Sequence, residues 1–293
     1  MESKKCAQQN IRAHAPAPRF RKWNAIWSKT SFLFLFVIIS ACAQNQDEFK
    51  WPNGVQAAIC LTYDDGLPSH IQTAAPMLDR YNFKGTFYPT LSSESLYMNM
   101  DEWKALTANG HELGNHSVYH PCSKSDVGME WVADYHDLDS YTHDQIVEEL
   151  KLANSFLLAM DGLKERTFAY PCAHTAAGGE TYKDHVSQDF SAARGSSEKQ
   201  SNLVSPLEID LFDVPSWAPN QHDGKALIDY VDKIIKNKTL STLTFHGIGA
   251  EHMRVSKKAH EELLMYLDEN RDKIWVATFK EATDYLNSKR AKK

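Results

Sequence analysis

The chain has 293 residues, of which 42% are hydrophobic and 24% charged, as expected for a globular protein of one large domain or two small ones. Its formal charge of −6 is uneven: residues 1–41 carry seven Lys/Arg and one Glu, so residues 42–293 carry 25 Lys/Arg against 37 Asp/Glu, a net of −12. An acidic body repels phosphates and argues against a nucleic-acid partner, but it is compatible with a neutral sugar.

The amino-terminal region has the pattern of an export signal. A basic stretch precedes an apolar run at residues 32–39, which has the length of a signal-peptide core rather than of a membrane span. The sequence Ile39-Ser40-Ala41-Cys42 then resembles a bacterial lipobox. We expect a lipoprotein-type signal peptide over residues 1–41, a lipidated Cys42 as the sole membrane contact, and a tether over residues 42–50. The alternatives are cleavage before Gln44, giving a secreted protein, and an uncleaved anchor.

Strand-like and helix-like segments alternate from residue 51 onwards. The expected elements are, in chain order, strand 55–63, helix 70–81, strand 84–88, helix 101–109, a helix from the Thr142/Gln145 capping box to about residue 161, strands 167–170 and 190–194, helix 226–235, strand 240–245, a helix capped by Ser256, strand 274–278 and a terminal helix. This order predicts an α/β fold, with a parallel sheet or barrel, in one domain over residues 51–293. Functional residues are then expected at the carboxyl ends of the strands.

Polar side chains occur where several of these strands end. His116 and His120 are four residues apart, so a helical turn would direct both imidazoles to one side. With one carboxylate they would form a three-ligand site that leaves a position for water, as catalytic zinc requires. Of the adjacent Asp64 and Asp65, one could bind the metal and the other could take a proton, while His246 could protonate a leaving group. The residues alone do not assign the two aspartates.

Three sequence blocks carry a resemblance to a known family. The blocks LTYDDG (residues 61–66), GHELGNHSVYHP (110–121) and TLTFHG (242–247) are similar, in order and in approximate spacing, to those of the polysaccharide deacetylase family. This family is also called the NodB-homology family or carbohydrate esterase family 4. The resemblance extends from about Val55 to the terminal helix. It implies a single distorted (β/α) barrel that removes acetyl groups, N-acetyl in preference to O-acetyl, from a poly- or oligosaccharide.

The resemblance also implies roles for individual residues. Asp64 would be the general base acting on a metal-bound water, and His246 would be the general acid. Asp65, His116 and His120 would hold a divalent metal, with zinc favoured and cobalt, nickel or manganese as alternatives. A backbone N–H near the end of the second strand, that of Tyr88 or a neighbour, would stabilise the oxyanion.

The third block of the family departs from its pattern in this sequence. The family places an arginine two residues before a proline, where it steadies the base. Here Ala169 occupies that position and only Pro171 is retained. Arg194, after the next expected strand, is a candidate to supply the missing charge, with a surface or structural ion pair as the alternative.

The fourth and fifth blocks are also altered. The segment DLFDVPSW only loosely resembles the fourth block, and it makes Asp213 and Trp217 candidates for tuning His246 and lining the site. In the fifth block, Thr244 replaces the family's leucine. These departures affect the substrate pocket more than the metal site.

The segment between residues 121 and 142 is longer than a tight connection requires. Its aromatic residues Trp131, Tyr135 and Tyr141 could stack on sugar rings or could pack the loop onto the barrel. Cys122 and Cys172 each follow a proline at the edge of a block, so a disulfide between them is a hypothesis, with buried free thiols as the alternative.

The remaining polar residues near the blocks receive simpler interpretations. His111, Glu112 and Asn115 are expected to build the turn that presents the metal ligands, and His174 is expected to be structural. His252 could approach the substrate. Other histidines, including His70 and His260, are expected at the surface.

These observations favour a monomeric deacetylase of acetylated glycans in the bacterial cell envelope. Two alternatives stay open: an inactive carbohydrate-binding protein on the same scaffold, and an amidohydrolase of a small non-sugar amide.

Overall fold

The computed structural model describes residues 49–195 and 203–291, which belong to one compact unit spanning Asp47–Lys293. The expected signal peptide, Cys42 and nearly all of the tether lie outside the described residues. Within the described ranges, no helix has the length and apolar character needed to cross a membrane.

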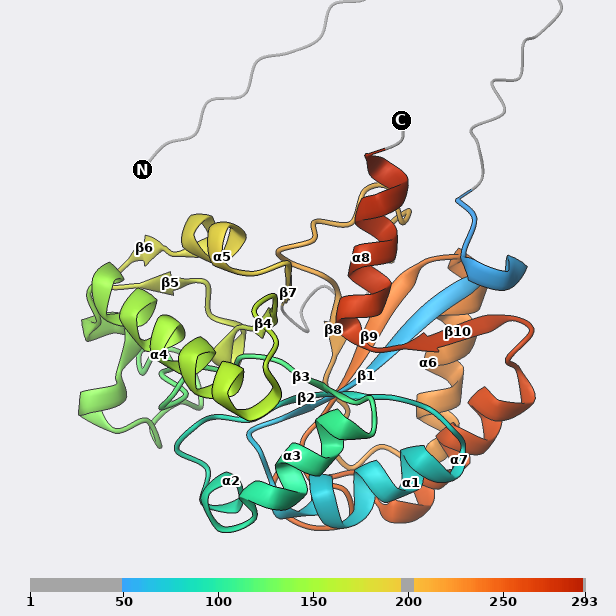
Figure 1. Ribbon diagram of the computed structural model, residues 1–293, viewed down its shortest axis with the longest axis horizontal. Coiled ribbons are helices and arrows are strands. Elements are labelled where there is room, and N and C mark those ends of the chain that lie inside the picture. The colour runs from blue at the N-terminus through green and yellow to red at the C-terminus, as the bar shows by residue number, and fades with distance from the viewer. Residues whose placement is uncertain (1–48, 196–202, 292–293) are drawn as a thin grey trace, which may run out of the picture. The chain divides into compact units, whose positions relative to one another are not determined.

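Short parallel strands form the centre of the unit (Figure 1). They are β1 (Ala57–Asp64), β2 (Thr86–Tyr88), β3 (Glu112–Leu113), β4 (Thr167–Ala169), β7 (Ala192–Arg194), β8 (Ser216–Trp217), β9 (Leu240–Phe245) and β10 (Ile274–Ala277). β1 is the central strand: β9 pairs along one side of it, while β10 and then β2 pair along the other side. A small antiparallel hairpin, β5 (Ala176–Ala177) with β6 (Glu180–Thr181), lies apart from this arrangement.

The parallel strands close into a circuit. Hydrogen-bonded pairing runs β3-β2-β1-β9-β8 in one sheet and β4-β7 in another. Two single bridges join the sheets, Asn115↔Phe168 between the chain after β3 and β4, and Arg194↔Val214 between β7 and the chain before β8. The order β1-β2-β3-β4-β7-β8-β9 therefore returns to β1, which gives the distorted (β/α) barrel that the resemblance implies, with two weakly paired seams.

Helices cover the barrel. They are α1 (Ala75–Arg80), which continues a π-helical turn at His70–Ala74, α2 (Glu94–Met98), α3 (Met100–Ala108), α4 (His143–Asp161), α5 (Lys183–Asp189), α6 (Gly224–Asn237), α7 (Lys257–Glu269) and α8 (Phe279–Arg290). Figure 1 shows β1 and β9 running between α8 and the group α1, α3 and α7. Because side chains alternate along a strand, Leu61 and Tyr63 pack outward against helices, whereas Thr62 and Asp64 point into the barrel.

The long elements agree with expectation. β1 and β9 lie where the sequence predicts strands, and the Thr142/Gln145 capping box that opens α4 is confirmed. The two-residue strands β3 and β8, the hairpin β5–β6, and the short helices α2 and α5 were not predicted. Elements of two to seven residues show little hydrophobic period, although the equally short β2, β4 and β7 lie within strands that the sequence predicts.

Candidate active site

The two adjacent aspartates occupy different environments at the carboxyl end of β1. Asp64 is the last residue of the strand and is 3% exposed. Asp65 has a left-handed backbone (φ 77°), and its N–H donates to the Tyr88 carbonyl oxygen at 3.0 Å. This change of backbone conformation ends the regular alternation of side chains along β1, so the two carboxylates have different neighbours.

Asp65 faces both histidines of the predicted metal pair. Its Oδ1 atom lies 3.5 Å from His116 Nε2 and 3.4 Å from His120 Nε2. This buried oxygen has no hydrogen-bond partner among the described residues. The expected helical turn is wrong: Ser117 (φ 66°) and His120 (φ 56°) adopt left-handed conformations, and this irregular turn brings the two imidazoles together.

Side chains from outside the turn hold it in place. The Ser117 N–H donates to Asn115 Oδ1 at 2.8 Å, and the N–H groups of Val118 and Tyr119 donate to Glu149 Oε1 at 3.1 and 2.9 Å. Asn115 therefore builds the turn as predicted. Glu149 on α4 was not anticipated, because its position in a helix more than thirty residues away gives no local signal.

The predicted roles of His111 and Glu112 in this turn are wrong. His111 is buried beside α1, where its Nε2 lies 3.2 Å from Asp79 Oδ1. Glu112 accepts hydrogen bonds from the Thr86 hydroxyl and the Lys280 N–H, both at 2.9 Å, and so ties β2 and β3 to α8. Both residues act in the packing of the barrel.

The donor set fits a divalent metal ion. His116 Nδ1 donates to the Ala169 carbonyl oxygen at 2.8 Å, which fixes the tautomer that leaves Nε2 as a ligand atom. Burial lowers the pKa of His120 to about 4, so its imidazole is neutral at pH 7, as metal binding requires. Burial raises the pKa of Asp65, but the neighbouring imidazoles, foremost His116 and His252, outweigh it and hold the pKa well below the usual value. Asp65, His116 and His120 together form a three-ligand group.

Arg194 forms a buried bidentate ion pair with Asp64. Its Nη1 and Nη2 atoms lie 2.7 and 2.5 Å from the two carboxylate oxygens, and Nη1 also donates to the Thr62 hydroxyl at 3.0 Å. In the β4–β7 ladder, Arg194 is the register partner of Ala169. The guanidinium that the third block lacks at Ala169 is thus present on the neighbouring strand, directly beside that position.

The surroundings of Arg194 are adapted to it. The hydroxyls of Thr62 and Thr244 lie 3.4 Å apart, so the threonine that replaces the family's leucine adds a polar neighbour beside the guanidinium. The Arg194 guanidinium also lies 5.3 Å from the centre of the Tyr88 ring. Burial raises the pKa of Asp64, but the positive charge of Arg194 outweighs this and lowers it below the usual value.

The prediction that the Tyr88 N–H stabilises the oxyanion is wrong. Tyr88 is paired with Asp64 in the parallel β1–β2 ladder, and its carbonyl accepts from the Asp65 N–H. In a parallel ladder the N–H of a paired residue points to the same neighbour as its carbonyl, so this N–H is directed at β1. Tyr88 supports the site through its buried ring.

His246 follows β9 on the other side of Asp65. Its Nε2 lies 3.9 Å from Asp65 Oδ2, and its buried Nδ1 has no hydrogen-bond partner among residues 49–195 and 203–291. Burial lowers the pKa of His246, whereas Asp65 and Asp64 raise it; the net direction is downward.

Two predicted neighbours of His246 lie elsewhere. Asp213 pairs with Lys183 at 3.4 Å and lies against Gly195, and it does not bond His246 Nδ1, which has no hydrogen-bond partner among the described residues. Trp217 packs in the core layer against Tyr230 of α6, with ring centres 4.8 Å apart, and does not line the site. The loosely matching fourth block placed both residues near the site, and the two-residue strand β8 turns the Trp217 ring outward.

Two histidines that were expected at the surface are buried. His70 accepts from the Leu67 N–H at 3.2 Å through Nδ1 and lies 3.0 Å from the His246 carbonyl oxygen through Nε2, so it anchors the backbone of His246. His260 pairs with the Tyr63 hydroxyl at 2.8 Å. The spacing of His70, Ala74 and Leu78 follows one helical face, and this period could have indicated that His70 is buried.

His252 makes a direct contact with the site. Its Nε2 lies 2.8 Å from Asp65 Oδ2, the carboxylate oxygen that faces away from His116 and His120. The side chain is 55% exposed. The hydrogen bond that His252 donates to the Asp65 carboxylate raises the pKa of His252.

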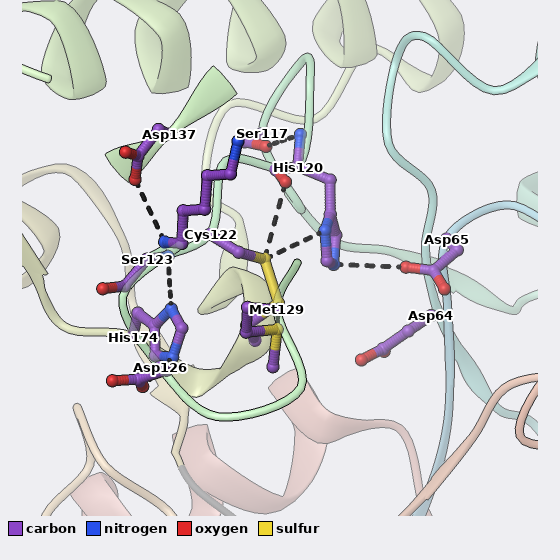
Figure 2. The surroundings of a disulfide bond; sticks show 12 residues. Asp64, Asp65, Ser117, His120, Cys122, Ser123, Asp126, Met129, Asp137 and His174 are labelled. Carbon is purple, nitrogen blue, oxygen red and sulfur yellow. Dashed lines mark hydrogen bonds and ion pairs between the residues drawn. A yellow bond between two sulfur atoms is a disulfide. The ribbon is translucent and has the colours of Figure 1, made fainter. Parts of the chain in front are cut away.

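A disulfide between Cys122 and Cys172 closes the other edge of the site, as hypothesised. Figure 2 shows His120 between this disulfide and Asp65. The Cys122 sulfur lies 3.4 Å from His120 Nδ1. The pair joins the turn of the metal ligands to Pro171–Ala173, the turn that follows β4, so Pro171 supports the site through its position in that turn.

The loop after Cys122 carries exposed aromatic rings beside the metal ligands. Trp131 is 63% exposed, and its ring centre lies 6.3 Å from that of His120. Tyr135 is 77% exposed, whereas Tyr141 is half-buried against the core of α4 and β4. Of the two interpretations of these aromatic residues, Tyr141 fits packing, while Trp131 and Tyr135 are available for contact.

Residues 52–185 match the sequence model of the family described as polysaccharide deacetylase. This region belongs to the polysaccharide deacetylase family. The matched region contains Asp64, Asp65, His116 and His120. Arg194 and His246 lie beyond it.

Individual relatives are distant. The chain is 24% identical to a gellan lyase of a Bacillus species over 261 residues, which cover 80% of the chain and 10% of the lyase. It is 25% identical over 134 residues to the peptidoglycan-N-acetylmuramic acid deacetylase PdaA of Bacillus subtilis, covering 45% of the chain and 44% of PdaA. The matched regions therefore span less than half of either relative. A crystal structure of a candidate polysaccharide deacetylase from Mycobacterium smegmatis covers 83% of the chain and 94% of its own, with a TM-score of 0.59 and 13% identity, and it shares the fold.

Proposed function

We propose that this protein is a metal-dependent deacetylase of glycans. The observation that carries the proposal is the unpaired, buried Asp65 Oδ1 atom between two imidazole Nε2 atoms at 3.4 and 3.5 Å. An uncompensated carboxylate oxygen is costly to bury, and a cation in this position would remove the cost. Family membership supports the same chemistry.

Each residue then has a stated task. Asp65, His116 and His120 would hold the ion, and when bound it would polarise the acetyl carbonyl and lower the pKa of water. Asp64, kept ionised by Arg194, takes a proton from the attacking water. His246 donates a proton to the departing amine or hydroxyl from the opposite side. Acetate and the free sugar amine or hydroxyl are the products.

The exposed aromatic rings favour a sugar over a small amide as the substrate. Trp131 is exposed next to His120, and a sugar ring stacked on it would place its acetyl group near the metal ligands. A small non-sugar amide would not need such a surface. N-acetyl is favoured over O-acetyl.

We also propose that the protein acts outside the cytoplasm, as a monomeric lipoprotein anchored at Cys42. The lipobox-like sequence supports this location. The Cys122–Cys172 disulfide does too, since disulfides persist in oxidising compartments.

Acetate release with zinc, cobalt, nickel or manganese tests the function. The substrates would be chitooligosaccharides, acetylated xylan, peptidoglycan fragments, poly-N-acetylglucosamine and a small amide such as N-acetylethanolamine. We expect release from at least one glycan and none from the small amide. Tight glycan binding without release under any metal would instead identify a binding protein.

The contribution of Trp131 is tested with the substrate that reacts. Trp131→Ala should raise KM by about 2- to 10-fold, since an aromatic contact contributes about 0.5–1.5 kcal/mol, with a smaller effect on kcat. Tyr97→Ala removes an exposed ring from α2 and serves as the control. Equal KM values for the Trp131 variant and the wild type would show that Trp131 does not bind the glycan.

A further inference from the structure

The Asp65 carboxylate has histidines on both of its oxygens. Oδ1 faces His116 and His120, whereas Oδ2 lies 2.8 Å from His252 Nε2 and 3.9 Å from His246 Nε2. The group Asp65, His246 and His252 has its ligand atoms within 4.8 Å of one another, as does the group Asp65, His116 and His120. Two potential ligand groups therefore share one carboxylate.

We propose that Asp65 Oδ2, His246 and His252 form a second, weaker site for a divalent cation. A cation there would occupy His246 Nε2 and so prevent proton donation, which makes the second site inhibitory at excess metal. This inhibitory consequence rests on the proposed function, whereas the binding itself does not.

The chemistry of the ligands allows both sites to fill. An ionised carboxylate has two oxygens with about four lone-pair positions, so Asp65 can bridge two cations. Two-metal sites in enzymes have separations of about 3.5–4 Å, the scale of a bridging carboxylate. Imidazole nitrogens select zinc, copper, nickel and cobalt over magnesium or calcium.

The second site is weaker because its histidines are less well supported. His116 is held by a hydrogen bond from Nδ1 to the Ala169 carbonyl oxygen at 2.8 Å, whereas His246 Nδ1 has no such partner in the described part of the chain. Loss of such a support costs about 10- to 100-fold in metal affinity. The 55% exposure of the His252 side chain lets an ion reach this side and keeps the ligand partly solvated.

The loop that carries His252 nevertheless fixes its position. The His252 carbonyl oxygen accepts from the Gly247 N–H, and the Gly247 carbonyl oxygen accepts from the Val255 N–H, both at 3.1 Å. Glu251 is tied to the Ser69 N–H at 3.3 Å. These bonds place His252 over Asp65 before any ion binds.

The other ligand groups within the described residues are poorer candidates. His120, Cys122 and Cys172 lie close together, but the two sulfurs are bonded to each other. His143 and His185 form a pair with ring centres 4.4 Å apart, and this pair could take up zinc adventitiously. The experiment must therefore separate it from His252.

Zinc binding to the metal-stripped protein tests the proposal. Calorimetry and metal analysis after gel filtration should give two ions for the wild type, the second bound about 10- to 100-fold more weakly than the first. His252→Ala should bind only the tight ion, whereas the control His185→Ala should bind both. Excess zinc should inhibit acetate release by the wild type and not by His252→Ala.

Three results for the second ion would overturn the proposal. They are a single ion in the wild type, a second ion retained by His252→Ala, and a second ion lost in His185→Ala. Loss of the tight ion in His252→Ala would also contradict it and would show that His252 only orients Asp65. Absence of any deacetylation would contradict the proposed function without changing the ion count.

Discussion

Asp64 and Asp65 are neighbours in the sequence, yet their surroundings are opposite. Both oxygens of Asp64 are paired with Arg194, whose guanidinium is also bonded to Thr62. Asp65 keeps one buried oxygen without a hydrogen-bond partner among the described residues. The Asp64 carboxylate is fully paired within the protein, whereas the buried Asp65 oxygen is in a position that a cation would fit. This contrast is the basis for proposing Asp64 as the base and Asp65 as the metal ligand.

The largest effect is expected from neutralising Asp64. Asp64→Asn keeps the shape of the side chain but removes the base, so kcat should fall by about 10²- to 10⁴-fold. Steady-state acetate release measures this change. Retention of more than about one tenth of kcat would show that Asp64 is not the base.

Removing Arg194 tests whether its ion pair is what stabilises the buried Asp64 carboxylate. Arg194→Met leaves a buried carboxylate unpaired, which should cost about 3–5 kcal/mol in the free energy of unfolding. Urea denaturation measures the loss. An unchanged midpoint would mean that the ion pair does not hold Asp64.

The register of the ladder provides a companion variant. Adding Ala169→Arg to Arg194→Met returns the guanidinium to the neighbouring strand, as in the family pattern, and should recover part of both stability and activity. A double variant that is no more stable and no more active than Arg194→Met would show that an arginine at position 169 cannot replace Arg194.

The disulfide affects the Asp65 side, because it supports the turn that carries His120. Cys122 and Cys172 are 50 residues apart, so replacing both by serine should lower the free energy of unfolding by about 2–4 kcal/mol. Reductant should lower the wild-type melting temperature and leave the double variant unchanged. If reductant lowered the melting temperature of both proteins equally, the disulfide would be excluded as the cause of this lowering.

The smallest effect at neutral pH comes from the buried His260. Burial lowers its pKa to about 3, so the folded state keeps His260 neutral, while the unfolded state takes up a proton below about pH 6.5. Stability should therefore fall as the pH decreases from 6.5 towards 4. In His260→Gln this slope should be smaller by about 1.4 kcal/mol per pH unit. If stability changed with pH by the same slope in both proteins, the lowered pKa of His260 would be contradicted.

The sequence predicted the elements whose period is long enough to read and the residues that directly follow them. β1, β9 and α4 were located within a few residues, and the chain order placed Asp64, Asp65 and His246 at strand ends. The geometry of the His116 turn was not predictable, because it depends on left-handed backbone angles and on Glu149 from another element.

The ion pair between Arg194 and Asp64 needed the register as well as the sequence. Arg194 and Ala169 are 25 residues apart and become neighbours only when β4 and β7 pair. Asp213 and Trp217 were misplaced for the converse reason: a loosely matching block does not fix which face of a two-residue strand a side chain occupies.

The most direct test of the account is the zinc affinity of matched asparagine variants of the two aspartates, measured by competition with a chelator. The contrast predicts that Asp64→Asn binds its first zinc ion nearly as tightly as the wild type, whereas Asp65→Asn loses tight binding. Tight binding by Asp65→Asn together with its loss in Asp64→Asn would reverse the two roles and contradict the account.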